Sequence, residues 1–145
     1  IGFGVVDKGR NPKFAGAGVI RTTIGDEDAS RLVEAYEGMK ELITEFKPDI
    51  ASVETLFFAQ NVTTGMAVSQ ARGVILLALA EEDIPIYEYT PLQIKMAMTG
   101  YGRATKAQIQ EMGKVQLKLK KKPSPDDAAD GLAVALTHLA TLQMQ

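Results

Sequence analysis

Residues 125–138 read PDDAADGLAVALTH, and this stretch decides how the rest of the chain is interpreted. Asp127 and Asp130 are three residues apart, so a helix places both carboxylates on one face. The apolar run from Gly131 to Leu136 predicts that this helix is buried in a core. Acidic residues are common at helix starts because the helix dipole favours negative charge there, so the pair alone does not establish a binding site.

A third carboxylate, Glu54, ends the segment DIASVE at residues 49–54, which predicts a buried strand. Ligands of open α/β sheets bind at the carboxyl ends of strands. Residues 126–145 contain no Lys or Arg, so the acidic residues of the last helix have no basic partner within it. Such a set of carboxylates favours Mg²⁺, a hard cation that takes oxygen ligands. Two such ions about 4 Å apart can hydrolyse a phosphodiester.

Charge is distributed unevenly along the chain, although the net charge is only −2. Residues 1–90 carry a net charge of −6, residues 91–125 a net charge of +7, and residues 126–145 a net charge of −3. A basic block beside acidic residues fits a DNA-cleaving protein, because lysines bind phosphates and carboxylates bind metal ions. Lysines on solvated helices give the same pattern, so charge alone leaves both interpretations open.

Apolar periodicity predicts an alternation of strands and helices. The predicted strands are residues 1–6, 14–20, 49–54 and 84–89, and the predicted helices are residues 30–46, 63–81, 91–100, 106–119 and 124–142. Thr90 and Thr105 are each followed three residues later by Gln, which is typical of a capping box. The alternation predicts an α/β fold with a mixed sheet flanked by helices, in a single domain over residues 1–145.

The composition is that of an ordinary globular protein of 145 residues with no cysteine, which excludes a disulfide framework and a thiolate metal site. No apolar run approaches the roughly 18 residues that a membrane span needs. No segment is similar to a signal peptide. We therefore expect a cytoplasmic protein that does not bind a membrane.

Several blocks of the sequence together resemble one known family. Residues 125–138 resemble the C-terminal signature of the RuvC family of Holliday junction resolvases, D-A-A-D-A/G-L-A-x-A-x-T-H. Residues 53–61 (VETLFFAQN) resemble its I/V-E-x-x-F block, and residues 70–74 (QARGV) are similar to its helix motif. Residues 89–95 and 100–106 are similar to its basic segment. The blocks match in order over essentially the whole chain, which makes the resemblance more specific than any single motif.

The resemblance implies an RNase H-like fold and a homodimer. It also implies Mg²⁺-dependent nicking of two opposed strands at a four-way DNA junction during recombination and repair. A branch-migration motor complex is the partner that it implies. The family's catalytic positions match Glu54, Asp127 and Asp130, which would hold two Mg²⁺ ions, and Lys95 and Lys106, which would lie near the scissile phosphate.

DNA contacts are expected from Phe57, Lys95, Arg103 and Lys106. Phe57 would stack on an unpaired base at the junction centre, and such stacking contributes about 1–3 kcal/mol per base. The alternative for this aromatic side chain is a place in the core. By family analogy, the helix predicted at residues 63–81 forms the dimer interface. Asp126, Arg72 and His138 receive no assigned role, and His138 is more simply a packed or surface histidine than a ligand.

The family's first strand has no counterpart in this sequence. That strand carries a G-I-D-P-G motif whose Asp contacts both metal ions and would precede the segment matching residues 1–6. Asp7 is not its equivalent, because it lies in the turn after the second family strand. The absent strand would be central in the sheet, so we expect that the sequence is incomplete and that restoring the strand restores cleavage.

Three alternatives stay open at this point. The first is a junction-binding protein of the same fold that does not cleave DNA. The second is another RNase H-like nuclease, which acts on RNA–DNA hybrids or on a different branched substrate. The third is a small α/β protein whose acidic residues only cap helices. A fold alone does not separate the first two alternatives from a resolvase.

Overall fold

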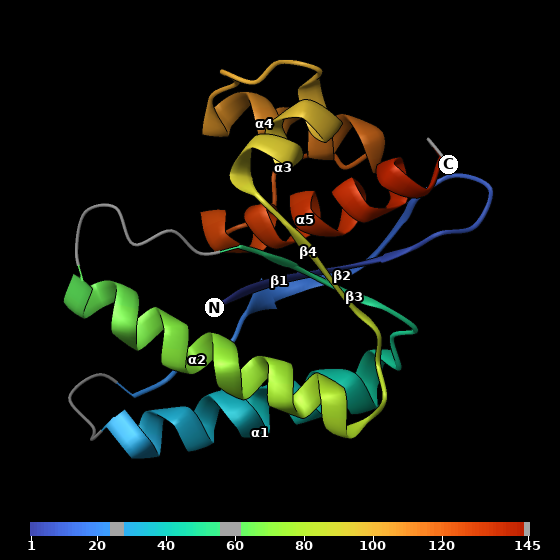
Figure 1. Cartoon of the computed structure of the whole chain (residues 1–145). Coiled ribbons are helices and arrows are strands. Elements are labelled where there is room, and N and C mark those ends of the chain that lie inside the picture. The colour runs from blue at the N-terminus through green and yellow to red at the C-terminus, as the bar shows by residue number, and fades with distance from the viewer. Residues whose placement is uncertain (24–27, 56–61, 144–145) are drawn as a thin grey trace. The chain divides into compact units, whose positions relative to one another are not determined.

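The computed structural model describes residues 1–23, 28–55 and 62–143 (Figure 1). The strands are β1 (Gly2–Asp7), β2 (Lys13–Val19), β3 (Ala51–Glu54) and β4 (Ile86–Tyr89). The helices are α1 (Asp28–Phe46), α2 (Val62–Glu81), α3 (Pro91–Thr99), α4 (Lys106–Gln116) and α5 (Asp126–Gln143). This order is the predicted one. Contacts divide the chain into two compact units: unit 1 comprises Ile1–Val19, Ser52–Glu54 and Tyr87–Gln145, and unit 2 comprises Ile20–Ala51 and Thr55–Ile86.

Unit 1 opens with a hairpin of the first two predicted strands. β1 and β2 pair antiparallel from Gly2 opposite Val19 to Asp7 opposite Lys13, with a β-bulge between Val5 and Val6. Among the described residues, the strands are hydrogen-bonded in two pairs, β1 with β2 and β3 with β4. The α/β class is therefore as expected, while the predicted mixed sheet takes the form of two small ladders.

Helix α5 packs directly on β1, and glycines allow the two backbones to come close. A Cβ added to Gly2 would overlap the carbonyl of Asp127, and a Cβ added to Gly4 would overlap the backbone of Leu132. On the helix side, a Cβ added to Gly131 would lie 2.5 Å from the carbonyl carbon of Phe3. This close contact fixes the first two turns of α5, which carry the predicted acidic residues, against the start of β1.

Helices α3 and α4 pack on α5 in unit 1 (Figure 1). Both begin with the predicted capping box: the hydroxyls of Thr90 and Thr105 accept from the backbone N–H of Gln93 and Gln108, and the Gln side chains accept in return. Gly100 ends α3 in the left-handed conformation with φ 74°. The apolar core that joins these helices to α5 consists of Tyr89, Ile94, Met98, Leu117, Leu132, Ala133, Val134 and Leu136.

Unit 2 is built on the pair of helices α1 and α2. The Tyr36 hydroxyl of α1 donates a hydrogen bond to the Glu81 carboxylate at the end of α2. Along α2, three large apolar side chains stay exposed: Met66 is 59 % exposed, Val68 43 % and Leu77 55 %. No helix in the described part of the chain is long and apolar enough to cross a membrane.

Candidate active site

The candidate site gathers charged side chains from three elements of unit 1. Glu54 lies exposed at the end of β3, and the three strand residues before it are half-buried where a buried strand was predicted. Asp130 lies half-buried on α5, next to the fully packed Ala128 and Ala129. Asp127 lies exposed in the first turn of α5, one turn before Asp130. The close packing of α5 on β1 therefore sets the position of the helix that carries both aspartates.

Helix α4 supplies the basic side chain of this group. The Nζ atom of Lys106 lies 3.1 Å from the Oδ2 atom of Asp130, with 58 % of the lysine side chain and 40 % of the aspartate side chain exposed. Such an exposed ion pair contributes only about 0–1 kcal/mol of stability. Lys106 is the first residue of α4, where the helix dipole disfavours a cation. A lysine at this position does not stabilise α4 itself, and its favourable contact is the one with Asp130.

Asp130 has a second contact from α4 that the sequence did not suggest. The Nε2 atom of Gln110 donates to the Oδ1 atom of Asp130 over 3.4 Å. Gln110 is only 7 % exposed, so its amide is packed into the protein. A signal existed in the spacing, because residue 110 lies four positions after Lys106 and thus on the same helix face. Burial of a polar residue was not predictable without knowing what covers α4.

The charges of the site are coupled. Partial desolvation of its carboxylate raises the pKa of the exposed Glu54, repulsion by Asp130 raises it further, and Lys106 opposes the shift. The hydrogen bond and the charge of Asp130 raise the pKa of Lys106, with smaller contributions from Asp126 and Asp127. Glu54 and Asp130 are thus close enough to repel each other. Such a pair gains most from a nearby cation.

A divalent cation fits the chemistry of these ligands. Glu54, Asp127 and Asp130 offer only carboxylate oxygens, which hard cations such as Mg²⁺ prefer. Within the residues that the structure describes, no three His, Cys, Asp or Glu side chains surround a common point that would hold a metal ion. The donor atoms therefore fit a divalent cation, although the three carboxylates do not converge on one point in this conformation. Lys106 is paired with one of the two Asp130 oxygens.

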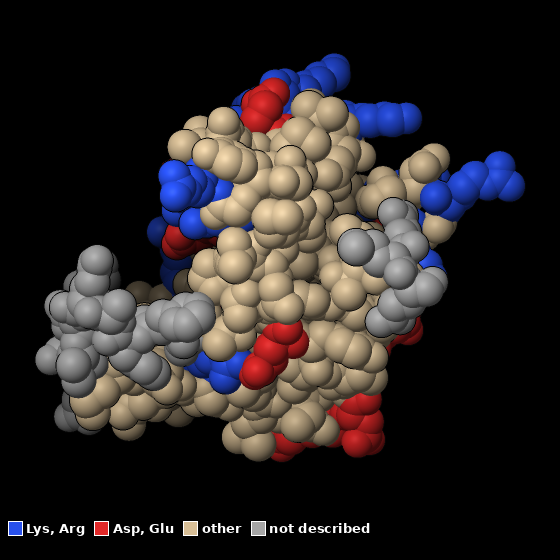
Figure 2. Space-filling view, turned by 45° about the horizontal axis from the view of Figure 1, so that its top comes forward, with Lys and Arg blue, Asp and Glu red and all other residues tan. Residues whose placement is uncertain are grey.

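The other predicted DNA-binding residues are placed as follows. Lys95 is half-buried on α3, and Arg103 is exposed in the turn between α3 and α4. Phe57 lies outside the described residues. Figure 2 shows Lys and Arg side chains gathered in the upper part of the view; the exposed basic residues around α4 and the segment that follows it are Arg103, Lys106, Lys118, Lys120 and Lys121.

His138, for which both a packed and a surface position were open, is packed. It is 6 % exposed, and its Nδ1 atom lies 2.6 Å from the hydroxyl of Tyr89. The ring of Tyr87 lies over it, with ring centroids 4.5 Å apart. Burial lowers the pKa of His138 below its ordinary value of 6.5.

This lowered pKa predicts a loss of stability in acid. The unfolded chain binds a proton at His138 more readily than the folded chain, so the stability from the neutral ring is present at neutral pH and lost as pH falls below 6.5. We expect His138→Gln to reduce the loss of unfolding free energy between about pH 7 and about pH 5. Urea denaturation at a series of pH values measures this, and identical pH dependence in both proteins would contradict it.

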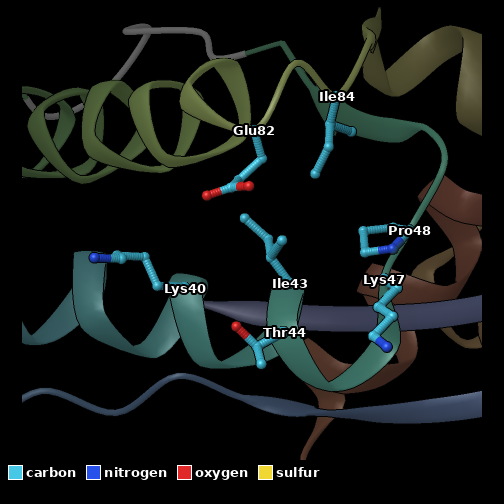
Figure 3. A pocket seen from close by; sticks show the side chains of 7 residues that line it. All are labelled: Lys40, Ile43, Thr44, Lys47, Pro48, Glu82 and Ile84. Carbon is cyan, nitrogen blue, oxygen red and sulfur yellow. The ribbon is translucent and has the colours of Figure 1, made fainter.

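Unit 2 contains a separate cavity that includes none of the predicted site residues. It has a volume of about 350 Å³ and is lined by Lys40, Ile43, Thr44, Lys47, Pro48, Glu82 and Ile84 (Figure 3). Glu82 is the only carboxylate among these lining residues, and two lysines, Lys40 and Lys47, line the cavity with it. The cavity therefore lacks the set of several carboxylates that the acidic site presents.

The chain is similar in sequence and in structure to known proteins. The sequence model of one family, described as crossover junction endodeoxyribonuclease RuvC, matches residues 1–138. The chain belongs to the RuvC family. The protein of that name from Petrotoga mobilis is 54 % identical over 139 residues, which cover 95 % of this chain and 85 % of the relative. The one from Brevibacillus brevis is 52 % identical over 139 residues, which cover 95 % of this chain and 84 % of the relative.

Solved structures of the RuvC family agree with the fold. The structure of Thermus thermophilus RuvC superposes with a TM-score of 0.89 at 33 % identity, covering 99 % of this chain and 89 % of the other. The structure described as RuvC of that organism in complex with Holliday junction substrate gives a TM-score of 0.88 at 30 % identity, covering 99 % and 87 %. These matches confirm the predicted RuvC family and its RNase H-like α/β fold.

Proposed function

We propose that this chain nicks opposed strands of four-way DNA junctions by phosphodiester hydrolysis, in recombination and repair. The observation that carries the proposal is the contact of Lys106 with Asp130 over 3.1 Å between two helices, beside Glu54 at the end of β3, whose pKa the charge of Asp130 raises. Membership of a family of crossover junction endodeoxyribonucleases supports it. The structural neighbour with a bound Holliday junction substrate supports the same class of DNA.

We propose that Glu54, Asp127 and Asp130 hold Mg²⁺. When bound, such ions activate a water molecule and stabilise the leaving oxygen of a phosphodiester. The chain's own contribution is to hold the carboxylates at the edge of a packed helix, where their repulsion favours a cation. Lys106 neutralises Asp130 in the absence of the cation. Because the ion pair is exposed and weak, the lysine ammonium can leave Asp130 and contact a phosphate of the DNA instead.

DNA binding is assigned to the basic residues around α3 and α4. Lys95 and Lys106 would contact the scissile phosphate, and Arg103 would contact the backbone of a junction arm. Phe57 would stack on an unpaired base at the junction centre. Contacts with phosphates position the duplex without reading its sequence, so junction shape would dominate the choice of substrate.

The DNA-binding assignment predicts a specific change in salt dependence. We expect Arg103→Ala to weaken junction binding and to reduce the slope of log affinity against log salt by about 0.9, because one fewer counterion is released. Titrations of a labelled junction in Ca²⁺ at several salt concentrations measure the slope. Lys40→Ala on α1 is the control and should leave the slope unchanged. An unaltered slope in Arg103→Ala would remove this residue from the DNA contacts.

We further propose a homodimer that forms through α2, a cytoplasmic location, and a branch-migration motor complex as partner. Met66, Gly73 and Leu77 are spaced at seven and four residues, so they share one face of α2. All three are exposed, and an added Cβ at Gly73 would meet nothing within 4 Å. This apolar, open face suits a second helix, and a two-fold dimer suits two opposed cuts.

The dimer assignment predicts that Leu77→Lys favours the monomer. A buried lysine without a partner destabilises an interface, so we expect the dissociation constant of the dimer to rise at least about tenfold. Analytical ultracentrifugation over a range of concentrations measures the dissociation constant. Leu92→Lys, which changes an exposed leucine of α3, is the matched control. Equal dissociation constants in the Leu77→Lys and Leu92→Lys proteins would place the interface elsewhere.

The proposed activity is tested with a labelled four-way junction and a matched linear duplex, on native and denaturing gels with Mg²⁺. Two proteins are compared: the 145-residue chain, and the chain preceded by the first strand of the family, called here the extended protein. Symmetric nicks in the junction and none in the duplex are expected from the extended protein. Equal cutting of both DNAs would contradict junction selectivity. Junction binding without nicks by both proteins would identify a non-catalytic junction binder.

A further inference from the structure

Helix α4 presents two side chains to Asp130, and each contacts a different carboxylate oxygen. Lys106 lies 3.1 Å from Oδ2, and Gln110 donates to Oδ1 over 3.4 Å. The two residues are four positions apart and therefore share one face of the helix. Both oxygens of a single carboxylate are thus held from the same element.

The two contacts differ in how easily water replaces them. The Lys106 side chain is 58 % exposed, so its ammonium exchanges readily between Asp130 and solvent. Gln110 is 7 % exposed, and a buried amide that loses its hydrogen bond carries the full cost of desolvation. The rotamer of Gln110 is therefore tied to Asp130, while that of Lys106 is not.

The helix that carries Gln110 is itself fixed. Its first turn is closed by the reciprocal capping box of Thr105 and Gln108. One turn after Gln110, Gly113 is buried beside Met98 of α3 and Leu136 of α5. The Gln110 backbone is therefore held relative to α5, and its side chain reaches Asp130 from a constant position.

We propose that Gln110 is a positioning residue that holds the Asp130 carboxylate in one orientation for a divalent cation. The inference rests on the proposed metal site. Gln110 is neutral, so it orients the carboxylate without cancelling the charge that attracts the cation. Lys106 does neutralise that charge, so its ammonium must move away from Asp130 when the cation binds. A metal ligand whose orienting hydrogen bond is removed loses about 10–100-fold in metal affinity.

Gln110→Met tests this assignment, because Met keeps the length and volume of the side chain and has no donor. Isothermal titration with Mg²⁺, on the chain and on the extended protein, is expected to show a dissociation constant about 10–100-fold higher than in the unsubstituted protein. Gln116→Met, at the last residue of the same helix, should bind Mg²⁺ as the unsubstituted protein does. Gln110→Asn keeps an amide but shortens its reach, and it should bind Mg²⁺ as weakly as Gln110→Met.

Thermal melting followed by circular dichroism separates positioning from a purely structural role. Loss of Mg²⁺ affinity at a temperature where the variant is fully folded supports positioning. Normal Mg²⁺ affinity in both Gln110 variants, together with lost affinity in Asp130→Asn, would overturn the inference and leave the metal site intact. Absence of Mg²⁺ binding in the unsubstituted proteins would overturn the metal site, and the role of Gln110 with it.

Discussion

Replacing Asp130 with asparagine is expected to reduce the rate of junction cleavage by about 10³-fold or more, while junction binding persists. The substitution keeps the shape of the side chain and its contact with Gln110 but removes a negative charge from the proposed metal site. Loss of a single group that stabilises charge in a transition state costs about 10²–10³ in rate, and loss of a metal ligand weakens metal binding as well. Single-turnover cleavage in saturating Mg²⁺ measures the effect.

Asp126→Asn is the matched control for this prediction. Asp126 is exposed in the same first turn of α5 as Asp127, and it is not one of the three carboxylates proposed to hold the cation. We expect its cleavage rate to stay within about threefold of the unsubstituted protein, since surface substitutions away from a site have small effects. Equal rates for Asp130→Asn and Asp126→Asn would remove Asp130 from the catalytic group.

The second substitution with a large expected effect is at Gly2, where β1 packs against the first turn of α5. A methyl group at this position would overlap the Asp127 carbonyl and lie 2.7 Å from the Asp127 Cβ, so strand and helix must separate. Overpacking of this kind costs about 1–3 kcal/mol. We therefore expect Gly2→Ala to lower the free energy of unfolding by that amount. It should also slow cleavage, because it displaces the turn that carries the acidic residues.

Gly113→Ala provides the control within unit 1. An added Cβ there would lie 3.8 Å from Met98 and 3.9 Å from Leu136, which is ordinary van der Waals contact. Alanine also has the higher helix propensity, so we expect Gly113→Ala to stabilise α4 by up to about 1 kcal/mol. Chemical denaturation measures both variants. A Gly2→Ala protein as stable as the unsubstituted one would show that α5 does not depend on this close contact.

Local signals in the sequence predicted most of the fold. The Thr–Gln pairs at residues 90–93 and 105–108 define helix starts by their own hydrogen bonds, and both capping boxes are confirmed. The end of α4 was placed too late, near Leu119. The helix ends at Gln116, because Lys118 adopts a left-handed backbone with φ 55° and the Leu119 N–H returns to the Lys114 carbonyl. No glycine marks that turn, so it could not be predicted from residue type.

Only those features of the site that depend on residue type and spacing were predictable from the sequence. Glu54 after an apolar strand and Asp130 on an apolar helix were predicted as site residues, which stays a prediction, and the charge of Asp130 raises the pKa of Glu54. The pairing of Lys106 with Asp130 joins two helices and was not predictable from either. Gln110 was missed because a glutamine on an amphipathic helix is usually solvated, and only the packing of α4 on α5 buries it.

The central claim is that Glu54 and Asp130 bind a divalent cation that Lys106 replaces in its absence. The most direct test is the anomalous scattering of Mn²⁺ in crystals of the extended protein. We expect an anomalous peak about 2.1 Å from carboxylate oxygens of Glu54 and Asp130, with the Lys106 ammonium moved off Asp130. Mn²⁺ bound elsewhere in the crystal, with no peak at these carboxylates and Lys106 still paired to Asp130, would contradict the account.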